Sequence, residues 1–433
     1  KDGFEFMINL HNISPVDDAF EDYRLTEEDK EQILELSKRD DIYELLTNTL
    51  APEIHGHETV KQGLLLQLLE GNRPSDDCMK SESMDRWTSH ILLIGDPGIG
   101  KSQLVSAVNK RAPKCISISG TNTSQAGLTT SAVKDELTGT WTMEAGGVVL
   151  ADTGLLCIDE FDKLSASAQK SLNEPMEQLS VSSAKAGLVQ TMTARTSILA
   201  VANPKYSRFK DDKSFKEQLD IAESTLSRFD LIFALTDSIN EVNDKELATA
   251  LLSNSSKDDE LEVISDDCFK KYITYMKANC FPVLTDEVID VLSEFYVTVR
   301  QEASKSYDGK PITARDLKSL ERLTIARAKC EGRDYTELSD AQEAIRIYNE
   351  SLESLGLSVT TAGELQSIMS DEEVEIINDI ELMIKSEADY EGFPLSNESL
   401  SKLEFECGLK CHGTSLDSER VFRKCLLKVK KSL

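Results

Sequence analysis

The sequence lacks long apolar runs, and its cysteines form no recognisable pairs. Its apolar segments fall far short of the roughly 20 residues that cross a membrane, so we expect no membrane partner. The nine cysteines are scattered and include no C-x-x-C pair, which indicates reduced thiols in a cytosolic protein. The chain begins at Lys1 with neither an initiator Met nor a signal peptide, so we expect a fragment of a longer protein.

Positive charge is also scarce. The chain has 48 basic and 77 acidic residues among 433, and its net charge is −29. An acidic surface repels phosphate, which argues against nucleic-acid binding by the whole surface. Any DNA binding must therefore use a local basic patch.

Residues 95–102 read GDPGIGKS and fit the phosphate-binding P-loop pattern G-x-x-x-x-G-K-[ST]. The apolar run before them predicts a buried strand and the residues after them predict a helix, an order that favours a P-loop over a plain glycine-rich turn. We expect Lys101 to reach the β- and γ-phosphates of ATP and the Ser102 hydroxyl to hold Mg²⁺. The expected nucleotide-binding residues are Gly95, Asp96, Pro97, Gly98, Ile99, Gly100, Lys101, Ser102 and Gln103.

Five short apolar runs have the spacing of a parallel α/β sheet flanked by helices. They cover residues 91–94, 115–118, 155–158, 198–201 and 231–235. The third run ends in Asp159 and Glu160, an arrangement typical of a Walker B motif, although a strand that ends in solvated carboxylates is the alternative. We expect Asp159 to contact Mg²⁺ and Glu160 to act as the general base that deprotonates water.

Two polar residues after later strands are further candidates. Asn203 follows the fourth strand and is expected between the acidic strand ends and the γ-phosphate. Arg228 precedes the fifth strand and cannot easily reach its own P-loop, so it is a candidate arginine finger for a neighbouring subunit. A surface salt bridge is the alternative for Arg228.

The remaining sequence predicts further segments around this core. Residues 1–25 read as a linker from a missing N-terminal domain, and 26–237 as the ATPase core, with a helix over 58–69 that is apolar on one face. The core contains an insert at about 121–150 and a hairpin at about 179–195, whose tip at 184–187 carries Lys185. Residues 238–355 predict a helical lid, in which Thr313 and Asp316 cap a helix. A linker at 356–370 leads to a helical unit at 371–433, either a winged-helix-like or a protein-docking domain.

Taken together, these motifs resemble the MCM replicative helicases of the AAA+ class, most closely the archaeal branch. The resemblance covers about residues 10–355 and is carried in order by 51–57, 95–102, 156–161, 184–187, 194–197, 202–204, 226–230 and 312–315. The matches at 184–187 and 312–315 disfavour other AAA+ subclasses with the same hairpin, such as chelatases and transcription activators.

This resemblance implies a hexameric, DNA-dependent ATP hydrolase that moves 3′–5′ on single- and double-stranded DNA, with replication factors as partners. It implies that Asn203 is sensor 1 and that Arg228 and Arg315 reach the neighbour's nucleotide in trans. Lys134 in the helix-2 insert and Lys185 in the pre-sensor hairpin would contact DNA phosphates along a channel. The location would be cytoplasmic for an archaeal protein and nuclear for a eukaryotic one.

Some residues depart from the family pattern. Pro175 stands where it would break or kink a helix, Leu179 replaces a glutamine, and Gly147 replaces an alanine. These departures, with the absent N-terminal domain, motivate a second hypothesis. The chain could be a non-motor paralogue that binds ATP and DNA as a scaffold or as one subunit of a mixed ring.

Overall fold

The computed structural model describes residues 25–54, 56–74, 86–134, 140–185, 187–206, 208–209, 215–235, 262–305 and 313–355. The chain divides into two compact units, Lys1–Val359 and Thr360–Leu433, and all described residues belong to the first. The linker at 356–370 and the unit at 371–433 therefore lie outside the described residues, as do residues 1–24. No helix within the described ranges is long and apolar enough to cross a membrane.

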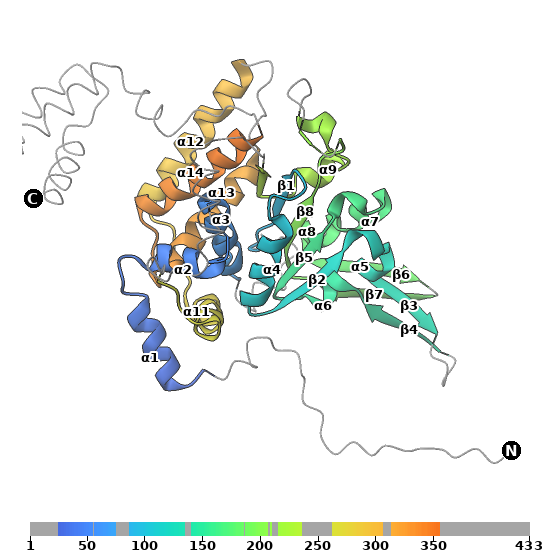
Figure 1. Ribbon diagram of the computed structural model, residues 1–433, viewed down its shortest axis with the longest axis horizontal. Coiled ribbons are helices and arrows are strands. Elements are labelled where there is room, and N and C mark those ends of the chain that lie inside the picture. Colours follow the sequence, from blue (N-terminus) through green and yellow to red (C-terminus); the bar gives the residue numbers. More distant parts are fainter. Residues whose placement is uncertain are drawn as a thin grey trace, which may run out of the picture. The chain divides into compact units, whose positions relative to one another are not determined.

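Five parallel strands form the central sheet, in the order β2-β5-β8-β1-β9 (Figure 1). Every neighbouring pair is parallel, and each of the five apolar runs forms one strand. The predicted α/β fold with a parallel sheet is therefore confirmed. The strands are β1 (Ile91–Gly95), β2 (Cys115–Ser119), β5 (Leu155–Asp159), β8 (Ser197–Ala202) and β9 (Leu231–Leu235).

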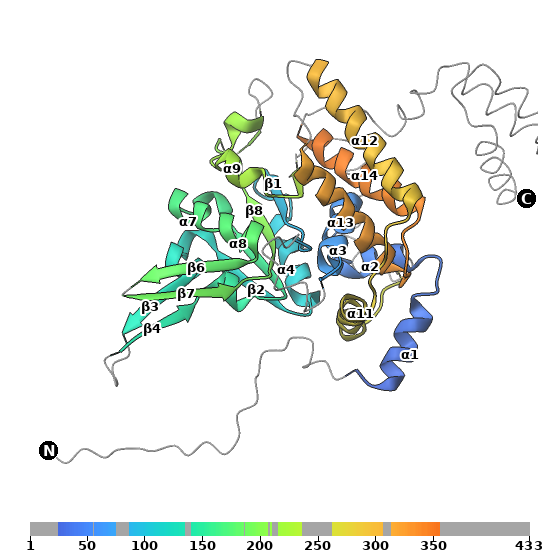
Figure 2. The ribbon, with the colours of Figure 1, turned by 180° about the vertical axis from the view of Figure 1, so that it is seen from behind.

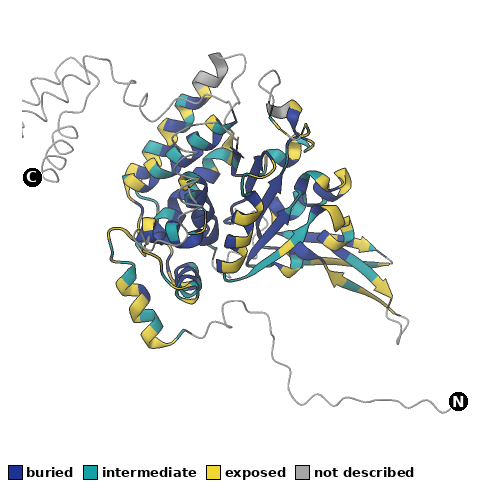
Figure 3. Cartoon of the chain, in the orientation of Figure 1, coloured by how far each residue is buried: buried dark blue, intermediate teal, exposed yellow. Residues whose placement is uncertain are grey.

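Different helices cover the two faces of this sheet, whose strands are largely buried except for the edge strand β2 (Figure 3). On one face, alternate strand residues such as Leu92, Leu156 and Ala200 share a core with the segment after β5. That segment contains η3 (Phe161–Lys163), α7 (Ala166–Ser171) and α8 (Asn173–Gln178). The other face packs against α3 (Glu58–Leu69) and α4 (Lys101–Arg111). Burial on both faces explains why the strands read as continuous apolar runs.

Helices α1 (Glu27–Leu36) and α2 (Ile42–Leu50) precede α3. Helix α1 begins at the expected place, since Thr26 and Asp29 form a reciprocal capping box. The expectation of a single apolar face on α3 is wrong, because even Lys61 and Gln67 are buried. Helix α3 is enclosed between the sheet and the lid helices, and the Gln67 amide donates to the carbonyls of Ser89 and Ile198 at 2.9 and 2.8 Å.

The lid consists of α11 (Asp266–Asn279), α12 (Asp286–Lys305), α13 (Ala314–Cys330) and α14 (Leu338–Ser354). Helix α13 begins with the predicted capping box of Thr313 and Asp316. It packs on α3, while α14 packs on β9, so the lid helices lie together on one side of the sheet (Figure 1).

Two antiparallel hairpins extend on the side away from the lid helices (Figures 1 and 2). The predicted one consists of β6 (Ser180–Lys185) and β7 (Leu188–Thr193), and the other, which was not predicted, consists of β3 (Thr130–Lys134) and β4 (Trp141–Ala145). Lys185 pairs with Leu188, so the turn is shorter than the expected tip at 184–187 and Lys185 lies on the strand. Shorter helices complete the described core: η2 (Gly120–Asn122), α5 (Gln125–Leu128), α6 (Gly147–Leu150), η4 (Phe215–Gln218) and α9 (Glu223–Leu226).

The break or kink expected from Pro175 agrees with the structure, in which the helical segment is interrupted one turn before the proline. The helical segment after β5 is interrupted at Leu172, and α8 restarts at Asn173. Pro175 then lies in the first turn of α8, where backbone N–H groups have no helical partner, so its missing N–H costs little. Leu179, the second of the three departures, is buried and adopts φ 56 directly before β6.

A buried carboxylate joins the core to the lid. Asp230, directly before β9, accepts hydrogen bonds from Arg86 at 2.6 Å and from Arg322 and Ser319 of α13. Its second oxygen accepts the backbone N–H of His90 at 2.7 Å. Burial alone would raise the pKa of Asp230, but the two guanidinium groups overcome this effect and hold that pKa below its ordinary value.

His90 stays neutral beside these cations. Burial, reinforced by Arg86, lowers the pKa of His90 to about 3. Its ring accepts the Ile198 N–H at 3.0 Å and lies 3.2 Å from the Met176 carbonyl oxygen, which requires the neutral form.

Replacing His90 should therefore reduce the acid sensitivity of the fold. The folded chain resists protonation of His90, whereas the unfolded chain titrates near 6.5. This contribution to stability is complete above pH 7 and falls by about 2 kcal/mol between pH 7 and pH 5. In His90→Gln, urea unfolding at the two pH values should show a smaller fall in the free energy of unfolding than in the wild type. An equal fall in both proteins would contradict this assignment.

Candidate active site

The P-loop forms a glycine-lined cradle between β1 and α4. Gly98 and Gly100 adopt φ 93 and 84, in the left-handed region that favours glycine. A Cβ at Gly98 would meet no atom within 4 Å, whereas one at Gly95 would lie 2.5 Å from the Leu235 carbonyl oxygen. The loop is thus anchored on β9 at its start and open at its centre, which fits a phosphate group held by backbone N–H groups.

Lys101 lies in this cradle as the first residue of α4. Its Nζ donates to the carbonyls of Gly95 and Asp96 at 2.6 and 2.5 Å. Burial lowers the pKa of Lys101, and the nearby carboxylates of Asp96, Asp159 and Asp162 oppose this effect. The cation is therefore brought close to the acidic end of β5, although 58 residues separate Lys101 from Asp159 in the sequence. Ser102, the next residue, is exposed at the start of the helix.

Asp159 and Glu160 stand at the carboxyl end of β5, as predicted. Asp159 Oδ1 accepts the Glu160 N–H at 2.9 Å, and Glu160 adopts φ 55, unusual for a residue with a side chain. The Glu160 carboxylate accepts hydrogen bonds from the hydroxyls of Thr121 and, at 3.3 Å, Ser119. Hydroxyl and carboxylate oxygens such as those of Ser102 and Asp159 are ligands that Mg²⁺ prefers, so this donor set fits the expected ion.

Asn203 also reaches this edge of the sheet. It follows β8, which lies between the Walker B strand β5 and the P-loop strand β1. Its N–H donates to Asp162 Oδ1 at 3.0 Å. The sheet order therefore brings the predicted residues of the P-loop, β5 and β8 to one edge, as expected where parallel strands end.

Arg228 and Arg315 gather elsewhere, around Glu177 in α8. Arg315 Nε and Nη2 donate to Glu177 Oε1 at 3.2 and 3.1 Å, and Arg228 Nε lies 3.4 Å from Glu177 Oε2. Arg228 also donates to the Ser224 carbonyl. Within the described ranges, neither guanidinium has a hydrogen bond or ion pair with the P-loop.

The two predicted DNA-contacting lysines lie at the ends of hairpin strands. Lys134 ends β3 opposite Trp141, whose side chain is half exposed. Lys185 ends β6, and its Nζ donates to the Thr130 carbonyl at 2.7 Å. Lys185 therefore joins the two hairpins to each other.

Two family models match this chain in succession. One, described as the MCM P-loop domain, matches residues 29–255, which is more than half of the chain, and the other, described as the MCM AAA-lid domain, matches residues 267–352.

The chain belongs to the MCM family.

Similar MCM proteins are DNA replication licensing factors. MCM4 of Arabidopsis thaliana is 40% identical over 339 residues, which cover 77% of this chain and 40% of that protein. MCM2 of Oryza sativa subsp. indica is 34% identical over 373 residues, covering 80% and 38%. The mcm7-B protein of Xenopus laevis is 37% identical over 355 residues, covering 81% and 49%.

Two facts about this MCM chain follow from these relatives. It spans less than half of their length. The relatives are eukaryotic, so they give no support to the expected likeness to archaeal members or to an archaeal cytoplasmic setting. The predicted AAA+ P-loop fold and the helical lid agree with the two matched domains.

Three contacting residues of the site were missed in the sequence. Thr121 and Ser119 hold the Glu160 carboxylate, and Glu177 holds the two arginines. The hydroxyls follow or end β2, the neighbour of β5, so the rule that parallel strands end together could have found them. Gly120 between them permits this approach, since a Cβ there would lie 2.2 Å from the Glu160 carbonyl oxygen.

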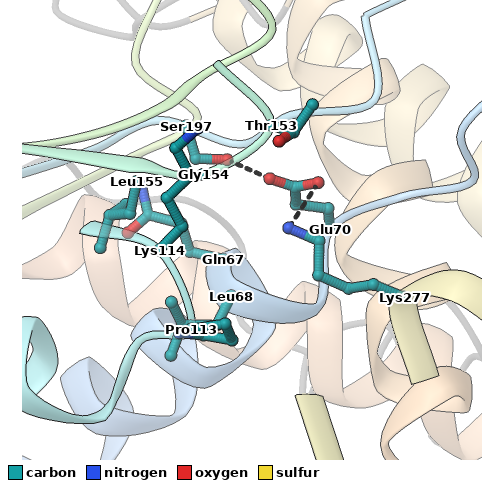
Figure 4. A pocket seen from close by; sticks show the side chains of 10 residues that line it. All are labelled: Gln67, Leu68, Glu70, Pro113, Lys114, Thr153, Gly154, Leu155, Ser197 and Lys277. Atoms are coloured by element: carbon teal, nitrogen blue, oxygen red, sulfur yellow. Dashed lines mark hydrogen bonds and ion pairs between the residues drawn. The ribbon is translucent and has the colours of Figure 1, made fainter. Parts of the chain in front are cut away.

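A cavity at the opposite edge of the sheet is not a second candidate site for a nucleotide. It lies at the amino ends of β5 and β8, where Glu70 bridges the Ser197 hydroxyl at 2.8 Å and the Lys277 ammonium at 3.1 Å (Figure 4). Its volume is about 20 Å³, which suits a water molecule. Glu70 here joins α3, β8 and the lid helix α11.

The substitution Gly98→Ala is expected to weaken nucleotide binding while preserving the fold. Alanine at φ 93 costs roughly 1–2 kcal/mol, and the free loop can relax because the added Cβ has open space. Binding must restore the cradle, so affinity for a fluorescent ATP analogue should fall about tenfold with little change in melting temperature.

Gly95→Ala is the matched comparison. Its Cβ would collide with β9, so its melting temperature should fall together with affinity. Unchanged nucleotide affinity in Gly98→Ala would show that this loop is not the phosphate cradle.

Proposed function

We propose that this MCM chain is the ATP-hydrolysing motor part of a DNA helicase that acts in replication as a hexameric ring. One observation carries the proposal. The P-loop, Asp159, Glu160 and Asn203 meet at one edge of the sheet, while Arg228 and Arg315 form a separate cluster on Glu177. A hydrolytic site that needs all of these groups is completed when one subunit's arginines meet the next subunit's P-loop.

Each group has a definite task in this proposal. The P-loop amides and Lys101 bind the ATP phosphates, and Ser102 and Asp159 hold Mg²⁺, which neutralises phosphate charge when bound. Glu160 accepts a proton from the attacking water, and Asn203 orients the reacting groups. Arg228 and Arg315 of the neighbouring subunit stabilise the charge that develops on the phosphates.

Glu160 needs a conformational change before it can act as a base. Its carboxylate accepts hydrogen bonds from the hydroxyls of Ser119, at the end of the neighbouring strand β2, and Thr121, in η2 directly after it. These hydrogen bonds direct the carboxylate toward the end of β2, so the Glu160 side chain must turn before it can meet the attacking water. Release of Thr121 would therefore activate Glu160, and a change at the β2–β5 edge can control hydrolysis.

The DNA role rests on the two hairpins. The hairpins extend on the side away from the lid helices, and their described strands contain Lys134 and Lys185 with Glu144 as the one acidic residue. Lysines arranged along a ring channel would follow phosphates without reading bases. We propose single- and double-stranded DNA and replication factors as partners, 3′–5′ movement, and a nuclear location, as suits the eukaryotic relatives.

The alternative is a non-motor paralogue, an ATP- and DNA-binding scaffold or a subunit of a mixed ring. Pro175 and the absent N-terminal domain motivate it, but Pro175 lies in the first turn of α8, where its missing N–H costs little. The full set of hydrolytic residues favours the motor. The two hypotheses differ in whether this chain hydrolyses ATP when it assembles.

ATPase activity per chain should rise with protein concentration, because assembly completes the sites. Glu160→Gln should reduce this activity at least 100-fold, since it removes the general base and retains nucleotide binding. A steady-state phosphate-release assay at increasing concentrations, with size measurement at each, tests this. Activity that is independent of concentration, or unchanged in Glu160→Gln, would contradict the proposal; nucleotide binding without hydrolysis would favour the scaffold.

Lys185→Ala is expected to preserve basal ATP hydrolysis and to abolish its stimulation by DNA. It removes the link to the Thr130 carbonyl and one basic charge of the hairpin, but no group of the ATP site. Basal ATPase should remain within about twofold, while stimulation by single-stranded DNA and unwinding are lost. Lys170→Ala, on α7, is a comparison variant with the same change of charge. Equal loss of basal and stimulated activity would contradict a DNA role for Lys185.

A further inference from the structure

Glu177 is the shared counter-ion of two arginines that come from distant parts of the chain. Arg228 follows α9, and Arg315 lies in the first turn of the lid helix α13. Arg315 Nη2 lies 3.1 Å from both oxygens of the Glu177 carboxylate, and Arg228 Nε lies 3.4 Å from Glu177 Oε2. Two guanidinium groups so close would repel each other without this carboxylate, so its charge permits them to stay together.

The ion pairs between Glu177 and the two arginines are weak enough to be exchanged for another anion. The Glu177 and Arg315 side chains remain 41% and 49% exposed, so water screens their attraction. Arg228 is more buried, yet its Nε lies near Glu177 without hydrogen-bond geometry and has no other partner in the described part of the chain. An incoming anion can therefore redirect both groups without breaking a strong buried pair.

Hydrogen bonds to other residues fix the backbone that carries Glu177, Arg228 and Arg315. The buried Arg86 guanidinium donates to the carbonyls of Met176 at 3.0 Å and Arg228 at 3.1 Å, and so joins α8 to the arginine segment. The Ser319 hydroxyl donates to Asp230 and also lies 2.9 Å from the Arg315 carbonyl oxygen, so the start of α13 lies beside the Asp230 carboxylate. The backbone positions of Glu177, Arg228 and Arg315 are therefore fixed relative to one another, and their side chains can still reorient.

Helix α8 also reaches the hairpin. Glu174, one turn before Glu177, accepts the Ser182 N–H of β6 at 2.7 Å. Leu179 is buried between α8 and β6, and its carbonyl accepts the Ala194 N–H at 2.8 Å. A change in the contacts between the arginines and Glu177 would therefore act on α8, the helix that contacts the β6–β7 hairpin.

We propose that Glu177 is a positioning residue, which holds Arg228 and Arg315 as one two-pronged site for the triphosphate of a neighbouring subunit and joins that site to the β6–β7 hairpin. The inference rests on the proposed function. The ligand is a nucleoside triphosphate presented by a second subunit. Its higher negative charge competes with the single carboxylate for both guanidinium groups, so binding at the interface loosens their hold on α8.

The test compares Glu177→Gln with the wild type in ATPase assays at a concentration where the wild-type chain is assembled. The variant should lower kcat about 10- to 100-fold, because the arginines lose their common orientation, while KM for ATP changes less than threefold, because the P-loop is intact. Glu177→Asp, which keeps the charge, should recover part of kcat. Glu262→Gln removes a comparable Glu–Arg pair, with Arg39, and should leave both constants within twofold.

A double variant distinguishes positioning from general structural damage. If Glu177 acts through the arginines, Glu177→Gln combined with Arg315→Ala should be hardly slower than Arg315→Ala alone. Multiplying losses, or a kcat of Glu177→Gln within twofold of the wild type, would overturn the inference and leave the proposed function standing. A wild-type chain that assembles without hydrolysing ATP would overturn both. Unchanged melting of Glu177→Gln is expected, since the side chain is 41% exposed.

Discussion

The buried carboxylate of Asp230 is the interaction on which the arrangement of core and lid depends. It accepts hydrogen bonds from Arg86 in the core and from Arg322 and Ser319 in the lid, beside neutral His90. Removing one partner of such a buried network leaves an uncompensated charge and typically costs about 3–5 kcal/mol. The network therefore adds little net stability but fixes the position of α13, because any other position would leave a buried charge without its partner.

This constraint determines where the functional arginines stand. Arg228 is two residues before Asp230, and Arg315 is one helical turn before Ser319. Both are placed on the same side of the molecule because the Asp230 network fixes both backbones. Arg86 extends this frame to α8 through the Met176 carbonyl. In the proposed ring, the Asp230 network would therefore determine how the two arginines are presented to a nucleotide on the neighbouring chain.

The features that sequence reasoning found are local or follow from strand order. The P-loop, the acidic end of β5 and the capping box at Thr313 each consist of neighbouring residues whose chemistry is complete within a few positions. The features it missed are tertiary. Glu177 lies 138 residues from Arg315, and Lys185 lies 55 residues from Thr130, so no spacing rule could join them. The break expected from Pro175 is present at Leu172, but its exact position, which places the proline in the first turn of α8, was not predicted.

Acidic groups and arginines occupy separate places in this chain, and this separation favours an ATP site that is shared between two subunits of the proposed ring. The cis edge concentrates Asp159, Glu160 and Asp162 around the cation of Lys101, so it needs further positive charge to stabilise an anionic transition state. The chain supplies that charge on Arg228 and Arg315 but directs it to Glu177, away from its own cradle. In the proposed ring, Arg228 and Arg315 of one subunit would serve the ATP site of the next subunit. ATP hydrolysis would then depend on assembly. Helix α8, which holds both arginines through Glu177 and contacts β6, would transmit their engagement with nucleotide to the hairpin.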